Sequence, residues 1–303
     1  MAISRAQLMK ELVPGLNALF GLEYKRYAEE HKDIFSVESS ERSFEEETKI
    51  TGFGPAPVKT EGEAVHYDEA QETYTARYTH ETISIGFSIT EEAFEDNLYD
   101  SLSSRYTKAL ARSMAHTKQV KAAAVLNNAF SPSFTGGDGV ALCATNHPLV
   151  MGGAFNSNTS ATPADLNETS LENAATQIAL WLDDRGLLIA GKPRKLIVPA
   201  AQVFTATRLL RSQYRPGTAD NDINAIYTNG TIPEGYFVNH WLVDPKTWYI
   251  ITDIPNGLKH FTRVALKTSN DPDFDTGNLR YKARERYSFG WSDPLGVYGT
   301  KGS

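Results

Sequence analysis

Cysteine is almost absent from this sequence, and long hydrophobic runs are missing. The single cysteine, Cys143, excludes a disulfide framework and a thiolate metal cluster within one chain. No apolar run approaches the roughly 18–20 residues needed to span a bilayer. Lys10 and Glu11 interrupt the N-terminal segment where a signal peptide needs an unbroken apolar stretch. We therefore expect a protein that needs no oxidising compartment and has no membrane partner.

A surplus of positive charge is absent as well. The chain has 30 Lys and Arg against 37 Asp and Glu, a formal net charge of -7. Proteins whose main task is to grip nucleic acid depend on Lys and Arg that neutralise phosphates, so that class is disfavoured. A protein that only encloses DNA stays compatible with this balance. Aromatic residues make up 11% of the chain, which disfavours disorder over its whole length.

Complete catalytic motifs are also lacking. Asp138, Cys143 and His147 are close in sequence and suggest a thiol nucleophile with its base. A catalytic cysteine also needs a lowered pKa and an oriented base, and no protease signature surrounds these residues. We interpret the segment as a loop that contains a small apolar cysteine, and we keep a Cys-His enzyme as the less favoured alternative.

Metal and phosphate motifs are incomplete in the same way. Asp271, Asp273 and Asp275 alternate like the start of a calcium loop, but Thr276 and Lys282 stand where that loop needs Gly and Glu. The segment 136–139 is rich in glycine without the Gly-Lys-Ser/Thr of a phosphate loop. The sequence therefore predicts no catalytic, cofactor-binding or metal-binding residue.

Residues 91–129 have the clearest helical pattern. Thr90 is a suitable N-cap, and no Pro or Gly interrupts the segment before Pro132. At 1.5 Å per residue this helix would be roughly 55 Å long, so it predicts the spine of an elongated subunit. Apolar residues recur along one stripe: Phe94, Leu98, Leu102, Tyr106, Leu110 and Met114.

Residues 44–89 have the pattern of a long two-stranded hairpin. The run 49–51 can pair with the alternating run 74–78, and the Gly- and Pro-rich segment between them has turn chemistry. The alternation changes parity near His80-Glu81, which predicts a bulge or bend. Isolated two-stranded ribbons are marginal in water, so we expect this hairpin to lean on a neighbouring subunit.

The other regions predict shorter elements. Residues 5–20 predict a short helix that is interrupted at Pro14-Gly15, and a second short helix is expected around 21–31. Alternating helices and strands over 165–265 predict a compact α/β domain, with a Thr169-x-x-Glu172 capping box at the start of its first helix. Residues 260–298 predict mostly strands.

A basic stripe lies within that last region. Arg280, Lys282, Arg284 and Arg286 have a two-residue period, which places them on one face of a strand. This stripe is either a solvated face of the sheet or a contact surface for an acidic partner. Binding of packaged DNA is a weaker third interpretation. The acidic partner that the sequence suggests is the segment 45–47 of a neighbouring subunit.

Taken in order, these segments resemble the tailed-bacteriophage major capsid proteins with the Hong-Kong-97-type fold, and in particular the Mu-like head-subunit branch. The resemblance covers about 45–299 and depends on the order of several motifs. They are ISIGFSITEEAFEDNLY (83–99), SLENA (170–174) with DRG (184–186), LIVP (196–199), WYIITD (248–253) and YSFGWSDPLGVYG (287–299).

The resemblance implies an α+β protein in four parts. These are an N-terminal arm (1–43), an extended β-hairpin loop (44–89), a peripheral domain whose sheet carries the spine helix (90–145 and 260–303) and an α/β axial domain (146–259). It also implies a structural protein with no catalytic residue. Hexamers and pentamers would form an icosahedral shell around double-stranded DNA, without sequence-specific binding.

The same resemblance implies a location and partners. The expected location is the virion, with assembly in the host cytoplasm, and the expected partners are portal and scaffolding proteins and decoration proteins. Some family members cross-link subunits through Lys and Asn. Lys59 lies in the corresponding loop, but the sequence identifies no Asn partner.

Two more alternatives stay open. An encapsulin-type nanocompartment shell would have the same fold with a protein cargo. A tail-tube or adhesin protein would also self-assemble, but the long helix disfavours it because such proteins are mostly β.

Overall fold

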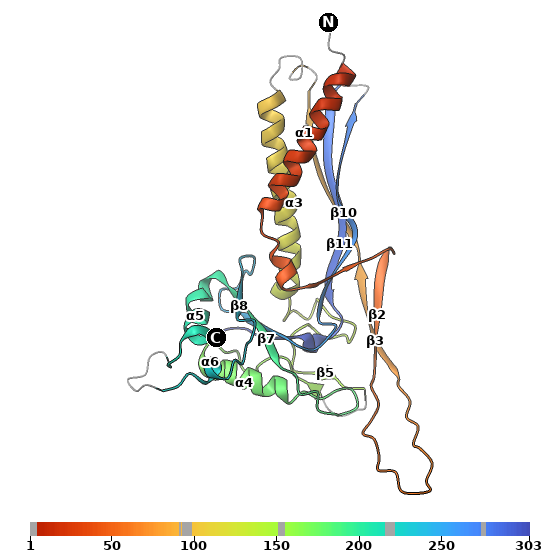
Figure 1. Cartoon of the computed structure of the whole chain (residues 1–303), viewed down its shortest axis with the longest axis vertical. Helices are drawn as coiled ribbons and strands as arrows, with labels where there is room; N and C mark the ends of the chain where they lie inside the picture. The colour runs from red at the N-terminus through yellow and green to blue at the C-terminus, as the bar shows by residue number, and fades with distance from the viewer. Residues whose placement is uncertain (1–4, 91, 93–98, 151–154, 216–221, 274–276) are drawn as a thin grey trace.

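A computed structural model describes residues 5–90, 92, 99–150, 155–215, 222–273 and 277–303. The molecule is elongated (Figure 1). Helices α1 (Arg5–Arg26) and α3 (Tyr99–Asn127) run side by side along the long strands β10 (Leu258–Pro272) and β11 (Leu279–Trp291). A lobe of short strands and helices lies at one end of them. A two-stranded ribbon projects away from the body beside this lobe.

The long strands belong to a four-stranded sheet, which we name the long sheet. Its order is β1-β10-β11-β4, with β1 at Ser36–Ser39 and β4 at Glu81–Ile89. Along β11 buried and exposed residues alternate, as period-two patterning predicts. The buried side chains of β11 pack with residues of the two helices in one cluster. Its members are Leu16 and Phe20 of α1, Leu110, Ala111 and Met114 of α3, and Tyr281 and Ala283 of β11.

The lobe contains a second sheet, the short sheet, of order β12-β9-β7-β8. Its strands are β7 (Pro193–Pro199), β8 (Tyr236–Asn239), β9 (Trp248–Thr252) and β12 (Val297–Thr300). Helices α4 (Glu168–Ala179), α5 (Val203–Arg211) and α6 (Ala225–Thr228) complete the lobe. The largest apolar cluster lies between these helices and the sheet, where Trp248 and Leu196 are fully buried. The predicted α+β class and α/β character of this region are confirmed.

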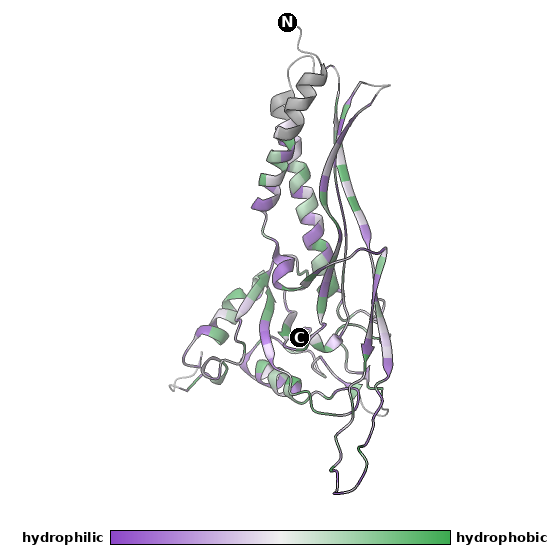
Figure 2. Cartoon of the chain, turned by 45° about the vertical axis from the view of Figure 1, so that its right-hand side comes forward, coloured by the Kyte–Doolittle hydropathy of each residue, from purple (hydrophilic) through white to green (hydrophobic). Residues whose placement is uncertain are grey.

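The ribbon consists of β2 (Phe44–Ile50) and β3 (Glu72–Thr79). Its register differs from the expected one, because Phe44 pairs with Thr79 and Thr48 with Thr75, so that Ile50 reaches Glu72. The pairing of 49–51 with 74–78 is therefore wrong by several residues. Residues 51–71 form the loop that connects β2 and β3, and we name this segment the ribbon loop. In both views it extends away from the body (Figures 1 and 2).

The chain changes sheets at His80. Strand β3 belongs to the ribbon, whereas β4 pairs with β11 along its whole length, from Glu81 opposite Tyr287 to Ile89 opposite Leu279. The parity change at His80-Glu81 thus marks a change of partner strand. Strand β12 likewise joins the short sheet and not the long one. The four-part division of the chain stays a prediction, with β4 and β12 placed differently from it.

Two helix predictions are wrong in detail. Helix α1 continues through Pro14-Gly15 to Arg26. Packing of Leu16 and Phe20 against α3 outweighs the cost of an interior proline. Helix α4 begins at Glu168 under a capping box formed by Asn167 and Ser170, so the box at Thr169 and Glu172 is not the one used. Asn is at least as good an N-cap as Thr.

The start of the spine helix, residues 91 and 93–98, lies outside the described residues. Short elements join the larger ones: the 3-10 turns η1 (Glu30–Asp33), η2 (Ala200–Gln202) and η3 (Pro294–Gly296), and strands β5 (His147–Pro148) and β6 (Phe155–Asn156). Within the described residues, no helix is both long and apolar enough to cross a membrane.

Candidate functional site: the base of the ribbon

Charged and hydroxyl side chains hold the base of the ribbon against the body. The ribbon closes where the Thr51 amide donates to the Gln71 carbonyl at 2.8 Å and the Gln71 amide donates to Thr51 Oγ1 at 2.9 Å. Thr51 is 3% exposed, so this point is covered by the body. Everything between these two residues is the ribbon loop.

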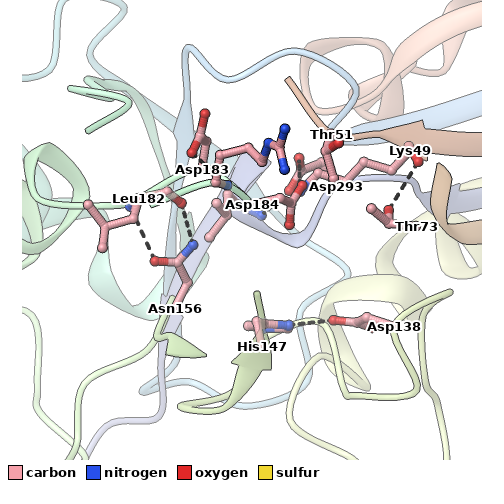
Figure 3. Close-up of polar contacts among 12 residues, drawn as sticks. Lys49, Thr51, Thr73, Asp138, His147, Asn156, Leu182, Asp183, Asp184 and Asp293 are labelled. Carbon is pink, nitrogen blue, oxygen red and sulfur yellow. Dashed lines mark hydrogen bonds and ion pairs between the residues drawn. The ribbon is translucent and has the colours of Figure 1, made fainter. Parts of the chain in front are cut away.

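Lys49 makes the first tie to the body. Its ammonium lies 3.3 Å from Asp184, in the turn after α4, and 3.0 Å from Asp293, directly after β11. Figure 3 shows these side chains converging from three separate segments. Burial alone would lower the pKa of Lys49, but Asp293, Tyr74 and Asp184 outweigh it and raise the pKa. Lys49 is therefore a charged anchor and a poor nucleophile.

Asp68 makes the second tie, from the other arm of the loop. Its Oδ2 accepts from the Gly54 amide at 2.7 Å, and its Oδ1 accepts from the Arg185 guanidinium at 2.6 Å. These bonds, from Gly54 first and then from Arg185, lower the pKa of Asp68. Arg185 also donates to the Glu69 carbonyl at 3.1 Å. One turn, 183–186, thus contacts both arms of the ribbon.

A third contact joins the ribbon to the end of the long sheet. Tyr78 Oη lies 2.5 Å from Ser292 Oγ, and its ring covers Gly290, where a Cβ would lie only 2.8 Å from that ring. Glu47 bonds to Ser292 and to the buried Lys259. The base of the ribbon is therefore fixed by buried polar groups from several elements.

The ribbon loop has the opposite character. Four of its apolar side chains are exposed: Phe53 by 61%, Val58 by 91%, Val65 by 59% and Tyr67 by 87%. Several exposed apolar side chains on one projecting segment indicate an interaction surface. The geometry is that of an arm with a rigid base and an apolar end.

The cysteine-containing segment does not form a catalytic site. His147 Nδ1 lies 2.6 Å from Asp138 Oδ2 (Figure 3). Its Nε2 lies 3.1 Å from Asn158 Oδ1, so both ring nitrogens are occupied. Cys143 packs in an apolar cluster with Leu142, and burial raises the pKa of its thiol. A buried thiol with a raised pKa is inert.

Asn158 explains why this segment is ordered. The side chain is fully buried, and its amide NH2 donates to the carbonyls of Leu142, Pro294 and Val297 at 2.6–3.0 Å. Its Oδ1 accepts from the Ala144 amide at 2.9 Å. Asn158 therefore ties the 142–147 loop to the C-terminal segment, and Asp138 and His147 extend the same structural network.

The two described aspartates of the calcium-like segment, Asp271 and Asp273, both lie beside Arg280. Asp273 forms an ion pair with Arg280, Asp271 lies opposite Arg280 in the sheet, and Asp275 is outside the described residues. No group of three or more candidate metal ligands occurs in the part of the chain that the structure describes.

The basic stripe lies on β11 as expected, on the face away from α1 and α3. The contact with segment 45–47 of a neighbouring subunit stays a prediction, and the carboxylates of this segment have contacts within their own subunit. Glu45 accepts from Ser40, Glu46 pairs with Arg77 at 3.7 Å, and Glu47 pairs with Lys259. Pairing of β2 with β3 brings these residues beside their internal partners.

The sequence matches the family of phage capsid proteins over residues 73–300. This chain belongs to that family. The match runs from the second strand of the ribbon to the last strand of the short sheet, and so it includes Asp184, Arg185 and Asp293 on the body side of the ties but not Lys49 and Asp68. No curated protein matches the sequence.

Solved structures agree with a capsid fold. The capsid of an empty GTA particle has a TM-score of 0.57 at 14% identity, with 90% of this chain and 89% of that chain covered. The capsid of Myoviridae phage XM1 has a TM-score of 0.53 at 11% identity, covering 89% of each. The virus-like particle from Pyrococcus furiosus has a TM-score of 0.55 at 11% identity, covering 96% of this chain and all of that chain. The fold is therefore the Hong-Kong-97-type capsid fold. Membership of the phage capsid family makes the chain a structural shell subunit.

Sequence reasoning missed the ties at the ribbon base. Asp184 lies in the turn after α4, where the sequence suggested no role for it, but it is 4% exposed and paired with Lys49. The residues next to an acidic side chain in the sequence do not predict that it will be buried. The DRG motif at 184–186 was the available signal, since it marked a turn that the family resemblance singled out.

Proposed function

We propose that this chain is the major capsid protein of a tailed phage. In this proposal it forms hexamers and pentamers that close into an icosahedral shell around double-stranded DNA, first in the host cytoplasm and then as the virion. Its role is structural and not catalytic. The observation that carries the proposal is the ribbon loop, a rigidly based arm whose apolar end is exposed within its own subunit.

The ribbon loop is suited to lie across an adjacent subunit. Its exposed apolar side chains would be buried there, and burial stabilises by about 25 cal/mol per Å² of apolar surface. The loop is also acidic, since residues 51–71 contain four carboxylates and one lysine. One carboxylate, Asp68, is taken by Arg185, which leaves Glu61, Glu63 and Glu69 for a partner.

The outer face of β11 offers complementary charge. Lys282 and Arg284 are exposed and form no ion pair with any described residue of their own subunit. The residues opposite them on β4 are small: Gly86 lies opposite Lys282, and Ser84 lies opposite Arg284. An extended acidic loop could therefore approach the strand closely. We assign this face of a neighbouring subunit as the partner of the ribbon loop.

The first experiment removes the arm. Residues 53–63 are replaced with a short Asn-Gly turn, and assembly is followed by sedimentation and electron microscopy. The expected result is a folded subunit that stops at monomers or single capsomers, because the Lys49 anchor and both sheets are retained. Within the loop, Val58→Asp should impair assembly, and the matched control Val58→Ile should not. Closed shells of normal size from the shortened chain would refute the proposal.

The second experiment tests the assigned partner face. Glu61→Lys with Glu63→Lys should impair assembly, and so should Lys282→Glu with Arg284→Glu. Combining all four changes should restore assembly in part, because the charges are complementary again. No recovery in the combined variant would mean that the loop and this strand are not partners.

The finer parts of this proposal come from the resemblance. They are the Mu-like branch, the portal, scaffolding and decoration partners, and covalent cross-linking. Lys59 is exposed in the ribbon loop, so its amine is accessible for an isopeptide cross-link to a neighbouring subunit. Mass spectrometry of purified shells for a linked Lys59 peptide tests that point.

A second candidate is a nanocompartment shell of the encapsulin type, with a protein cargo in place of a genome. The observation in its favour is the complete coverage of the archaeal virus-like particle by this chain. Electron microscopy of particles from the native source separates the two, because a phage shell has one portal vertex. Nuclease-protected DNA inside the particles favours the capsid, and a stoichiometric internal protein favours the nanocompartment.

A further inference from the structure

Helix α3 differs in charge from the rest of this acidic protein. Its 29 residues contain five Lys and Arg, and Asp100 is the one acidic residue among them. Two of the cations are neutralised by the long sheet, where Lys118 lies 3.2 Å from Glu285 and Lys121 pairs with Glu81. The positive charge that remains on the helix therefore comes from its other face.

That face is formed by Arg105, Lys108, Arg112 and His116, all exposed. Their spacing of three and four residues places them in one row along the helix, over roughly 16 Å at 1.5 Å per residue. Arg105, Lys108 and Arg112 form no ion pair within the described part of the chain. We name these four residues the helix face.

The helix face is hollowed where it meets the end of α1. An open cavity of about 460 Å³ is lined by Tyr27, Lys108, Ala109, Arg112, Ser113 and His116. Apart from Ala109, each lining side chain carries a hydrogen-bond donor, and none carries a carboxylate. Concave sites of cationic and hydroxyl donors suit phosphate oxygens. Glu23 is the nearest acidic residue along α1, and it accepts from Arg26 and Tyr27 at 3.5 Å.

The basic face of β11 is a weaker phosphate site. Arg280 is neutralised by Asp273, Asp271 is its cross-strand neighbour, and Arg286 donates to the Ser43 carbonyl at 3.4 Å. The two faces lie on opposite sides of the long sheet, since α3 packs on the Tyr281 side of β11. Each basic face can therefore serve a different partner.

We propose that the helix face contacts the phosphate backbone of packaged double-stranded DNA, and that the helix side of the subunit consequently faces the shell interior. This rests on the proposed capsid function, which supplies the DNA. Contacts through Lys and Arg to phosphates carry no sequence preference. Three such cations per subunit hold DNA weakly, which suits a genome that must leave the shell.

The experiment compares two variants of equal charge. The helix variant combines Arg105→Gln, Lys108→Gln and Arg112→Gln. The strand variant combines Lys267→Gln, Lys282→Gln and Arg284→Gln on the other side of the sheet. Each removes three exposed cations. Binding of a labelled DNA duplex of mixed sequence to unassembled full-length subunits is measured by fluorescence anisotropy over a salt series, and circular dichroism checks folding.

The helix variant should lose at least about tenfold in affinity, and its slope of log affinity against log salt should fall by about 2 to 3, because each phosphate contact contributes about 0.9. The strand variant should bind DNA nearly as the parent does. Arg105→Lys with Arg112→Lys keeps the charge and should also bind as the parent does. Equal losses in the helix and strand variants would mean that net charge alone controls binding, and would overturn the proposal.

Two further measurements separate this inference from the proposed function. The helix variant should still assemble, whereas the strand variant should assemble poorly, so an assembly defect reports on the ribbon contact and not on DNA. Closed empty shells should not bind DNA added from outside. Binding of outside DNA that is lost in helix-variant shells would place the helix face on the exterior and overturn the orientation. Equal affinity for polyglutamate and DNA would indicate an acidic protein as the partner.

Discussion

Acidification should destabilise the subunit through two buried histidines. His31 in η1 and His260 in β10 are each 1% exposed, and their rings meet edge to face with centroids 5.1 Å apart. His260 also stacks on Phe289 at 4.3 Å. Within the described residues, neither ring nitrogen of His260 has a hydrogen-bond partner, nor does Nε2 of His31. A proton on any of these three nitrogens would therefore be a buried charge without a hydrogen-bond acceptor.

The pKa values give the sign and size of the effect. Burial first, and then the positive charge of Lys118, lowers the pKa of His31 from 6.5 to about 4 and that of His260 to about 3. Both folded values lie below the unfolded value, so the stabilising effect is present above pH 6.5 and is lost as the pH falls towards the folded values. Between pH 7 and pH 5 each histidine should cost about 2 kcal/mol. The combined loss of about 4 kcal/mol is a large share of the stability of a typical domain, about 5–15 kcal/mol.

The assay is urea unfolding of the unassembled chain, followed by tryptophan fluorescence between pH 5 and pH 8. His260→Phe keeps an aromatic ring on Phe289 and removes one titrating group, so the slope of unfolding free energy against pH should fall by about half. Burial raises the pKa of Glu285, so acidification relieves a charge there and opposes the histidine effect. That opposing effect cancels in the difference between parent and variant. The control His66→Phe, in the exposed ribbon loop, should keep the parent slope. A parent whose stability is flat from pH 7 to pH 5 would refute the reasoning.

Three further predictions follow from buried positions in the subunit. Cys143 should react with a thiol reagent only after unfolding, because its thiol is buried in a core; rapid labelling of the native protein would contradict this. Cys143→Ala should lower the free energy of unfolding by about 1 kcal/mol without affecting assembly, because the thiol only fills space there. Asn158→Ala should cost about 3 kcal/mol or more in chemical denaturation, since it leaves three buried carbonyls without their donor; a loss below 1 kcal/mol would show that water replaces the amide. Ala123→Pro should abolish soluble folding, because a proline inside a helix costs about 3 kcal/mol and Ala123 is 1% exposed; helical, soluble protein at parental yield would show that α3 tolerates a break.

The sequence by itself determined the strongly periodic elements. The two-residue alternation of 279–287 and the long helical stripe before Pro132 predicted β11 and the described part of α3. Such patterns are local, because one face of each element meets the core and the other meets water. The ribbon loop followed from local composition, because its Gly, Pro and charged residues have little to bury, whereas the fold class came from the family resemblance.

The order of the motifs along the chain identified the protein family, which no single residue could do. No motif in the chain performs chemistry, so function had to be inferred from architecture and from the resemblance of segments between 83 and 299. The family match over 73–300 confirms that inference. The net charge of -7 was less informative about function, because it does not reveal that two basic faces lie on opposite sides of one sheet.

Only the tertiary structure decided which strands pair and which charges meet. The alternation of β4 is the same whether its partner is β3 or β11, and its hydrogen bonds go to β11. Helix α1 passes through Pro14 because packing against α3 is stronger than the local preference to break. Lys49, Asp184 and Asp293 look like ordinary surface charges, since nothing within a few residues of any of them specifies its partners. Their ion pairs exist because the fold brings three distant segments to the base of the ribbon, and a contact between distant segments leaves no periodic signal in the sequence.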